Sequence, residues 1–545
     1  MSEKLVIGIT FGIYLLIMLG IGWYFYNRTK NLSDYVLGGR GLGSWGTSIS
    51  AQASDMSGWL LLGLPGAAYA TGLSGSVWMA AGLALGTYLN WKLVAQRLRI
   101  STQEYSNAIT IPSYLENRFN DHSRLLRKAS SLFILLFFLV YTASGFVSGG
   151  KLFQTVFGVP YKVSIFICAI VVVGYTFLGG FMAVCWTDII QGLLMFFTLL
   201  ILPVVVLVKA GGINEVVSAI DPALLNPFNA ASITGSASSS TVLVVISIVS
   251  SLAWGLGYFG QPHILARFMA IKDPDLIKKS RIIAMFWVVL SLIGATAVGL
   301  VGHSVISDIS AYGGDSETIF MLLVNKCAPL ILTGILLSAI LAAIMSTADS
   351  QLLVAASTVS EDFYKGMIKP KASDRELILV SRLTVLAVAI IALIIAFNPN
   401  SSVLKLVSYA WAGFGAAFGP VILLSLFYKK MTRNAAATGM IVGGLTSVLW
   451  PLLKKVSSLA IFQLYEIVPG FLFAVLAIFI VTRIDIKNST DPKKIETKKA
   501  REKVKEQTAK EEKIKYEKTV VGTRKRKEAS KKRRKIAGKN RAKNR

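Results

Sequence analysis

Long apolar runs alternate with short polar segments along most of the chain. The first run, "LVIGITFGIYLLIMLGIGWYFY" (residues 5–26), is long enough to cross a bilayer as a helix. A cleaved signal peptide is less consistent with it, because "NRTKN" follows where small residues would mark a cleavage site. Lipid offers the backbone no hydrogen-bond partners, so these uninterrupted runs favour helices. We predict thirteen spans, at 5–26, 46–70, 75–95, 130–150, 162–182, 187–208, 242–262, 282–302, 330–355, 378–397, 403–428, 435–453 and 463–482.

Lysine and arginine residues gather in every second loop between these spans. The basic segments are "NRTKNLSDYVLGGRG", "QRLRIS…ENRFNDHSRLLRK", "ARFMAIKDPDLIKKSR", "YKGMIKPKASDRE" and "YKKMTR". Basic residues concentrate in cytoplasmic loops, so all five are expected on the cytoplasmic side. The opposite loops are poor in basic residues, with "LLKKVS" as a mild exception. We therefore predict an all-α integral membrane protein with its N-terminus outside and its C-terminus inside, as an odd number of spans requires.

Composition agrees with this class, since 54% of the residues are hydrophobic and only 16% are charged. From about residue 487 onward the chain holds 25 of its 57 Lys and Arg residues, against 8 of its 29 Asp and Glu residues. We expect a membrane domain over 1–482 and a disordered or partly helical cytoplasmic tail over 483–545. The tail is expected to lie on anionic lipid headgroups. It lacks interleaved aromatic residues and a folded module, so no specific nucleic-acid partner is predicted.

The sequence offers little for catalysis. His122, His263 and His303 are too dispersed to suggest a metal cluster, and the three cysteines show no CxxC pairing. No nucleophile–base pair or phosphate-binding loop is recognisable, so we do not expect an enzyme.

One predicted span carries both a carboxylate and helix breakers. The stretch "SAQASDMSGWLLLGLPGAAYATG" (50–72) places Asp55 beside Gly58, with Pro65 and Gly66 further on. A carboxylate at membrane depth costs at least a few kcal/mol unless it faces protein, water or a cation. A broken helix frees carbonyl groups that can coordinate Na⁺. The pattern therefore favours transport. A purely structural carboxylate would instead pair with a basic residue, and Arg40 is the nearest candidate.

A second broken span supports this interpretation. In "SSLAWGLGYFGQPHILARFMA" (250–270), glycines and Pro262 interrupt an aromatic-rich segment. The two broken spans are the second and the seventh, so they cross the membrane in opposite senses. This placement predicts an inverted repeat, with halves at about 46–208 and 242–428.

The ninth span adds hard oxygen ligands. In "SAILAAIMSTADSQLLVAAS" (338–357), Ala343, Ser346 and Thr347 are spaced i, i+3, i+4 and share one helix face. Such hydroxyls more often bond to their own helix, but beside a broken span carrying Asp55 they become candidate cation ligands.

These stretches resemble the sodium:solute symporter family, and within it the sodium/proline branch. The resemblance rests on "DYVLGGRGLGSW", "SAQASDMSGWLLLGLPGA", "WTDIIQ", "WGLGYFGQPHILARFMA", "GILLSAILAAIMSTADSQLLV" and "LVSYAWAGFGAAFGPVILLS", and it runs from about residue 5 to 482. It implies a LeuT-type five-plus-five inverted repeat in a prokaryotic cytoplasmic membrane. The implied activity is Na⁺-driven uptake of L-proline by alternating access, with Na⁺ as the coupling ion.

The resemblance also implies site residues. The sodium site would use Ala53, Met56, Ala343, Ser346 and Thr347, with Asp55 as an essential carboxylate. The substrate pocket would use Ser57, Gly58, Trp59, Tyr141, Trp254, Tyr258 and Pro262. Arg40 and Asp188 match positions used in coupling and gating.

Two positions depart from the family pattern. Gln52 stands where glycine is common, and it could tune the sodium site. Asp349 could raise Na⁺ affinity, form part of a second cation site, or be solvated near the cytoplasmic side. Two alternatives to proline symport stay open: a symporter of the same fold for another small solute, such as pantothenate or another amino acid, and a transporter-like sensor acting through the tail.

Overall fold

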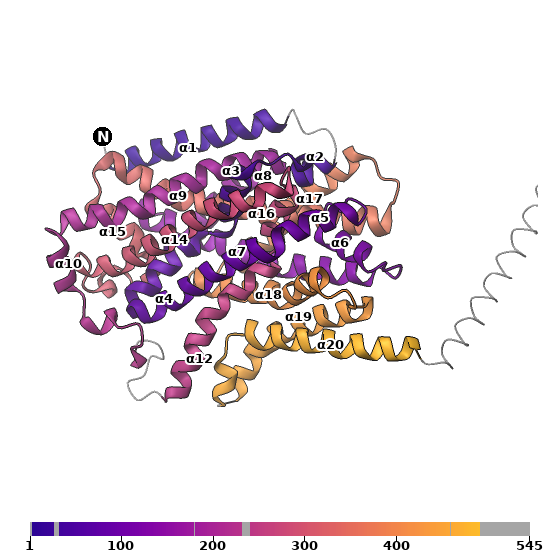
Figure 1. Cartoon of the computed structure of the whole chain (residues 1–545). Helices are drawn as coiled ribbons and strands as arrows, with labels where there is room; N and C mark the ends of the chain where they lie inside the picture. The colour runs from indigo at the N-terminus through magenta and orange to yellow at the C-terminus, as the bar shows by residue number, and fades with distance from the viewer. Residues whose placement is uncertain (1–2, 27–31, 179, 232–239, 458, 491–545) are drawn as a thin grey trace, which may run out of the picture. The chain divides into compact units, whose positions relative to one another are not determined.

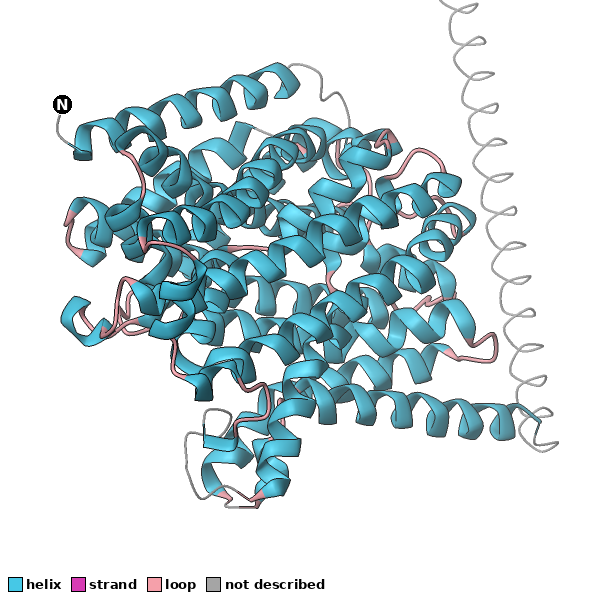
Figure 2. Cartoon of the chain, turned by 60° about the vertical axis from the view of Figure 1, so that its left-hand side comes forward, coloured by secondary structure: helices cyan, strands magenta, loops and turns pink. Residues whose placement is uncertain are grey.

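The computed structural model describes residues 3–26, 32–178, 180–231, 240–457 and 459–490. The chain divides into two units, Met1–Ile480 and Val481–Arg545, and the site lies in the first. The basic tail expected from residue 483 onward falls almost wholly outside the described residues. Figure 2 shows helices joined by loops, with no strand in the part of the chain that the structure describes.

Long apolar helices make up the bundle, labelled in Figure 1. They are α1 (Glu3–Tyr26), α4 (Leu64–Leu89), α7 (Leu125–Phe157), α8 (Tyr161–Leu178), α9 (Phe181–Lys209), α14 (Ile277–Val301), α16 (Leu330–Ser357), α17 (Asp374–Ile395), α18 (Val403–Phe427), α19 (Arg433–Val456) and α20 (Ile467–Thr490). Among the described residues, eleven helical stretches are long and apolar enough to span a membrane. Ten of them contain the helices above other than α8, which is a shorter apolar helix, and the eleventh covers 241–260. The count of thirteen membrane spans stays a prediction, as does the placement of the N-terminus outside and the C-terminus inside.

Burial separates central helices from peripheral ones. The apolar part of α16 is 78% buried, whereas α1 is 28% buried. Figure 1 shows α1 at one edge of the bundle, and α16 packs against α7, α9 and α1. The predicted inverted repeat begins at about residue 46 and leaves the first span outside both halves, and the place of α1 at the edge is consistent with that prediction. The exposed apolar side chains of α1 are typical of a lipid-facing helix.

The predicted span 46–70 is not one continuous helix. Instead, α3 (Ser44–Asp55) ends at Asp55, and helical structure resumes at Gly58, followed by η2 (Trp59–Gly63) and then α4. The next break lies at Gly72, whose φ of 65° kinks α4. A Cβ atom there would also lie 2.1 Å from the carbonyl oxygen of Leu224, so glycine is required on both counts. This kink marks the expected boundary between the second and third spans.

The predicted span 242–262 is interrupted as well. α12 (Thr241–Leu252) gives way to a 3₁₀ segment, η5 (Ala253–Gly260), and a new helix, α13 (Pro262–Ala270), starts after Gln261. Gln261 has extended backbone angles of −78° and 108°, and Pro262 suits the first position of a helix. The glycines of η5 permit close packing: a Cβ atom on Gly257 would meet the indole of Trp411 at 1.9 Å. Both predicted helix breaks are therefore confirmed.

Candidate functional site

Asp55 occupies the end of α3, and its side chain is completely buried. The hydroxyl of Tyr258 donates a 2.7 Å hydrogen bond to its Oδ2 atom, whereas Oδ1 has no hydrogen-bond partner. Its backbone carbonyl accepts from Trp59 Nε1 at 3.1 Å and from the Tyr141 hydroxyl at 3.0 Å. The two broken segments and α7 therefore meet at one residue. Arg40, the basic partner considered from the sequence, binds elsewhere.

The predicted sodium ligands from two distant segments lie next to each other. The hydroxyl of Ser346 in α16 donates to the carbonyl oxygen of Ala53 in α3 at 2.7 Å, and Thr347 donates to the same oxygen at 3.4 Å. Ser346 also approaches the carbonyl of Ala343 at 3.3 Å. Met56 is the residue at which α3 leaves helical geometry, with backbone angles of −86° and 81°. Hydroxyl and carbonyl oxygens brought together in this way are suitable ligands for a hard monovalent cation.

Aromatic side chains gather beside Asp55. The ring centroids of Trp59 and Trp254 lie 6.3 Å apart, and Tyr258 packs edge-on against Trp411 at 5.1 Å. Trp411 Nε1 donates to the carbonyl of Trp254 at 2.7 Å, which ties η5 to α18. This cluster supplies an apolar enclosure next to a carboxylate.

The remaining predicted pocket residues lie at the breaks. Met56 and Ser57 form the non-helical link after α3, Gly58 has helical backbone angles directly before η2, and Ser57 is 2% exposed. A Cβ atom on Gly58 would meet the Ser148 side chain of α7 at 2.2 Å. Pro262 begins α13 and lines a separate cavity on the expected cytoplasmic side, described below.

Asp188 belongs to a buried polar cluster. Its Oδ2 atom accepts from Ser50 at 2.6 Å and from Arg267 Nη2 at 3.2 Å, while Oδ1 has no partner. Arg267 also donates to Ser350, whose hydroxyl lies 3.3 Å from Asp349 Oδ1. The cluster thus holds two buried carboxylates and one guanidinium group.

Burial corrects two sequence interpretations in this cluster. Asp349 is fully buried, so the interpretation of it as a solvated residue is wrong. Arg267, assigned to a basic loop, is also fully buried in α13, because Asp188 and hydroxyl groups pair with it. Gln52 is 1% exposed, and its Oε1 atom has no hydrogen-bond partner.

His263 was considered from the sequence only as a metal ligand. Its position at the second helix break was not recognised. It is the second residue of α13, is fully buried, and neither ring nitrogen has a hydrogen-bond partner. Its ring lies 6.1 Å from that of Tyr141 and 5.7 Å from that of Phe138. A buried polar group without a partner costs free energy, so such a group points to a ligand or a functional constraint. The signal in the sequence is its place directly after Pro262, at the break.

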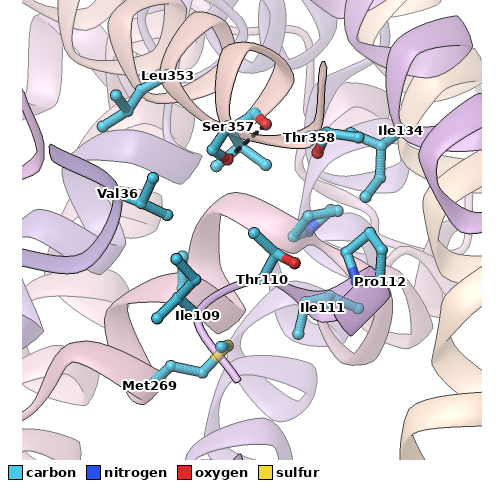
Figure 3. A pocket seen from close by; sticks show the side chains of 13 residues that line it. Val36, Ile109, Thr110, Ile111, Pro112, Ile134, Met269, Leu353, Ser357 and Thr358 are labelled. Carbon is cyan, nitrogen blue, oxygen red and sulfur yellow. Dashed lines mark hydrogen bonds between the residues drawn. The ribbon is translucent and has the colours of Figure 1, made fainter. Parts of the chain in front are cut away.

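A small cavity lies on the expected cytoplasmic side of the break. Figure 3 shows its lining: Val36, residues 109–112, Ile134 of α7, Met269 of α13, and Leu353, Ser357 and Thr358 from α16 and η10 (Thr358–Ile368). Pro262 also lines it, and its volume is about 20 Å³. Residues 109–112 therefore form part of the wall of this cavity, on the expected cytoplasmic side of the break at Gln261.

Arg40 holds the start of this closing segment. Its guanidinium group donates to Asn107 Oδ1 at 3.1 Å, to the carbonyl of Ala108 at 3.0 Å and to the carbonyl of Met269 at 2.6 Å. Burial, with the nearby Arg99, lowers the pKa of Arg40 to about 10, so it stays charged at neutral pH. The predicted gating residue thus joins the end of α13 to the segment that closes the cavity.

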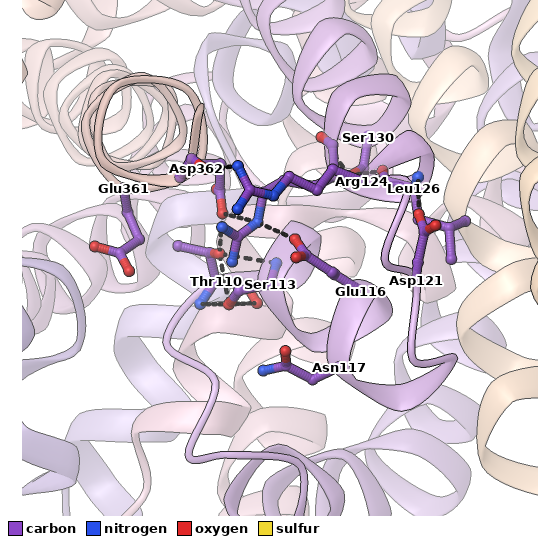
Figure 4. A network of polar contacts seen from close by, with 12 residues as sticks. Thr110, Ser113, Glu116, Asn117, Asp121, Arg124, Leu126, Ser130, Glu361 and Asp362 are labelled. Carbon is purple, nitrogen blue, oxygen red and sulfur yellow. Dashed lines mark hydrogen bonds and ion pairs between the residues drawn. The ribbon is translucent and has the colours of Figure 1, made fainter. Parts of the chain in front are cut away.

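A polar network holds the other end of the segment (Figure 4). Thr110 donates a 2.9 Å hydrogen bond to Asp362 Oδ1 in η10 and caps α6 (Ile111–Arg118). Arg127 of α7 lies 2.5 Å from Glu116 and 3.6 Å from Asp362. These contacts therefore join α6, α7 and η10 on the expected cytoplasmic side.

Glu317 makes a corresponding connection on the expected outer side. Its carboxylate accepts from the backbone N–H groups of Val403 and Leu404 at 2.9 and 3.0 Å, and from Ser402 at 2.7 Å. Lys151 of α7 lies 2.5 Å away. Negative charge is favoured at a helix N-terminus, so Glu317 fixes the start of α18 against α7.

Comparison with known proteins agrees with this geometry. Residues 35–443 match the sequence model of the Sodium:solute symporter family. The chain is 50% identical over 468 residues to the High-affinity proline transporter PutP of Bacillus subtilis (strain 168), covering 85% of this chain and 95% of that protein. It is 48% identical over 476 residues to the Sodium/proline symporter of Escherichia coli (strain K12), covering 87% and 92%.

A solved structure confirms the expected LeuT-type fold. A Na⁺-coupled sialic acid symporter superposes with a TM-score of 0.73 at 22% identity, covering 88% of this chain and 98% of that one. The matching family and the named relatives are secondary transporters, so the chain belongs to a transporter family rather than to an enzyme family. The chain belongs to the sodium:solute symporter family, as a multi-pass protein of the cytoplasmic membrane with Na⁺ as its coupling ion.

Proposed function

We propose that this chain takes up L-proline by symport with Na⁺ through alternating access. The carrying observation is the meeting of Ser346 and Thr347 with the Ala53 carbonyl, beside the broken end of α3 where Asp55 is buried. The relatives named as proline transporters support the choice of substrate. Proline has a compact apolar ring and a charged secondary ammonium group, which suit the aromatic cluster and a buried carboxylate.

The proposed sodium site consists of Ala53, Met56, Ala343, Ser346 and Thr347, with Asp55 near it. The proposed substrate site consists of Ser57, Gly58, Trp59, Tyr141, Trp254, Tyr258 and Pro262. Na⁺ bound between α3 and α16 orders the broken segment, and proline then binds beside it. Because each ligand binds one conformation more tightly than the others, their joint binding shifts the population toward occlusion and then inward opening. Arg40 and Asp188 couple these conformations.

Uptake into proteoliposomes tests this function. Labelled L-proline should accumulate only with an inward Na⁺ gradient, and a sodium ionophore should abolish the accumulation. Absence of proline uptake under any gradient would contradict the substrate assignment. Competition by pantothenate and other amino acids would then identify a different small solute.

We further propose that the basic tail lies on anionic lipid headgroups. The charge excess from residue 487 onward supports this placement, since each basic residue near an anionic surface contributes about 1 kcal/mol. Deleting residues 487–545 should leave uptake intact and weaken binding of the purified protein to anionic vesicles. Loss of uptake in that deletion would favour the sensor alternative instead.

A further inference from the structure

An apolar groove runs along the bundle surface between α4 and α14, two helices that pack against each other (Figure 1). Its volume is about 440 Å³, within the range of small-molecule sites. Small and branched apolar side chains form most of the lining, among them Leu73, Val77, Ala81 and Ala84 of α4 and Val289 and Ile293 of α14. Ile293 is 59% exposed, so the groove opens to the surroundings of the bundle. Because both helices span the membrane, those surroundings are lipid.

Two basic side chains lie at the expected cytoplasmic end of this groove. Tyr88 follows Ala84 by one helical turn, and Arg281 precedes Val289 by about two turns, so both helices carry the groove's lining face to this end. The Arg281 guanidinium group lies 5.4 Å from the centre of the Tyr88 ring, and Lys92 Nζ lies 5.5 Å from the same centre. These are distances at which a cation is attracted to an aromatic ring. Tyr88 therefore holds two cations next to the end of an apolar groove.

The charges of Lys92 and Arg281 are not neutralised by an ion pair. Neither residue has a carboxylate within 4.0 Å in the part of the chain that the structure describes. Two acidic residues, Asp273 and Asp275, belong to the loop before α14, but they are engaged within it: Asp273 Oδ1 accepts the backbone N–H of Asp275 at 2.9 Å. The end of the groove thus offers two cations to an anion from outside the chain.

We propose that this groove binds an anionic phospholipid of the cytoplasmic leaflet. One acyl chain lies in the groove between α4 and α14, and the headgroup phosphate lies against Lys92 and Arg281. Basic pockets between membrane helices on the cytoplasmic side suit anionic headgroups, whereas a lipid without net charge gains less from the same cations. The site is separate from the basic tail, and it does not depend on which solute the chain transports.

Photocrosslinking of the full chain in proteoliposomes locates the lipid. Phosphatidylglycerol with a diazirine on one acyl chain should label the segments 73–84 and 289–300 several-fold more than phosphatidylcholine with the same chains. Equal labelling of these segments by the two lipids would overturn the proposal, because it would show only the ordinary contact of a membrane helix with hydrocarbon. Mapping the labelled peptides separates this site from anionic lipid that lies against the tail.

Headgroup recognition is tested by removing each cation in turn. Arg281→Gln and Lys92→Gln should each lower the labelling of the groove by phosphatidylglycerol about two- to five-fold and leave the labelling by phosphatidylcholine unchanged. Arg281→Lys keeps the charge and should retain most of the labelling. Lys128→Gln is the matched control, since Lys128 is an exposed lysine of α7 on the same expected side. Unchanged labelling in both cation variants would overturn the proposal.

Filling the groove tests the site of the acyl chain while both cations stay in place. Phosphatidylglycerol should raise the thermal midpoint of the purified unaltered chain more than phosphatidylcholine does, because a ligand that binds the folded state stabilises it. Ala81→Trp should abolish this difference. Leu85→Trp is the matched control, because Leu85 is 58% exposed on α4 and lies outside the lining. A difference that persists in Ala81→Trp would place the stabilising lipid elsewhere and overturn the proposal.

Discussion

The Ser346 hydroxyl lies 2.7 Å from the carbonyl oxygen of Ala53, although 293 residues separate them in the chain. One belongs to the central helix α16, and the other lies two residues before the break at the end of α3. Both oxygens can also face a cation, because a hydroxyl accepts as readily as it donates. Two oxygen atoms that suit a hard cation such as Na⁺ therefore lie next to the end of α3 that carries Asp55.

Replacing Ser346 with alanine should weaken Na⁺ binding. The variant loses one ligand oxygen, which is worth about 1.4 kcal/mol, so the Na⁺ concentration for half-maximal proline uptake should rise about ten-fold. Ser338→Ala is a matched control: Ser338 is buried in the same helix but bonds to the carbonyl of Gly334 in its own helix. An unchanged Na⁺ dependence in Ser346→Ala would remove this residue from the site.

The Asp55–Tyr258 pair should be essential for transport. Asp55→Asn removes the buried negative charge, and we expect it to abolish Na⁺-driven uptake with normal membrane expression. Tyr258→Phe removes a hydrogen bond to a charged group, worth about 1.5–3 kcal/mol, and should lower kcat/KM about ten- to a hundred-fold. Tyr161→Phe is the control, because that hydroxyl bonds to the carbonyl of Ala396, away from the break. Full uptake by Asp55→Asn would contradict the assignment.

Apolar runs and helix breakers predicted an all-α membrane protein with two broken spans, and the family resemblance supplied the LeuT-type fold. The spacing of Ser346 and Thr347 and the breakers around Asp55 indicated that α16 and α3 form one site. Specific partners could not be predicted, because they depend on tertiary packing. Arg267 followed the pattern of a basic loop, yet Asp188 pairs with it in the interior. His263 was considered only as a metal ligand, because burial without a hydrogen-bond partner cannot be recognised from the sequence.

His263 should contribute to transport at a cost in stability. Burying an unpartnered polar ring is unfavourable by about 1–3 kcal/mol, so His263→Phe should raise the thermal midpoint of the purified protein. The same change should lower proline uptake, since it removes the polar ring nitrogens beside Tyr141. Unchanged uptake together with higher stability would show that His263 only fills space. His303→Phe is the comparison, because His303 already bonds to the carbonyl of Tyr69.

Arg40 should control the rate at which the inner side opens. Arg40→Lys keeps the charge, but a lysine cannot reproduce the planar donor set that reaches Asn107, Ala108 and Met269. We expect a several-fold change in maximal uptake rate, with a smaller change in the Na⁺ concentration for half-maximal uptake. Arg375→Lys, at an exposed position of α17, is the control. Equal maximal rates in both variants would exclude a gating role.

Glu317 should make the protein's stability depend on pH in the acidic range. Burial alone would raise the pKa of Glu317, but Lys151 and the N–H groups of Leu404 and Val403 outweigh burial and lower it. A carboxyl group with a lowered folded-state pKa stabilises the fold fully above its unfolded pKa of about 4.3. That stabilisation is lost as the pH falls through the folded-state pKa. Stability should therefore be constant near neutral pH and decline below about pH 4.

Glu317→Gln tests this assignment through the thermal midpoint measured from pH 7 to pH 3. At pH 7 the variant should be less stable by about 3–5 kcal/mol, because Lys151 loses its buried partner, although Asp315 at 2.7 Å compensates in part. The difference from the unaltered chain should shrink as the pH falls, since protonation of Glu317 has the same effect as the substitution. Asp308→Asn is the control, an exposed carboxylate on the same side that bonds only to Ser310. A pH-independent difference would mean that Glu317 acts through its shape rather than through its charge.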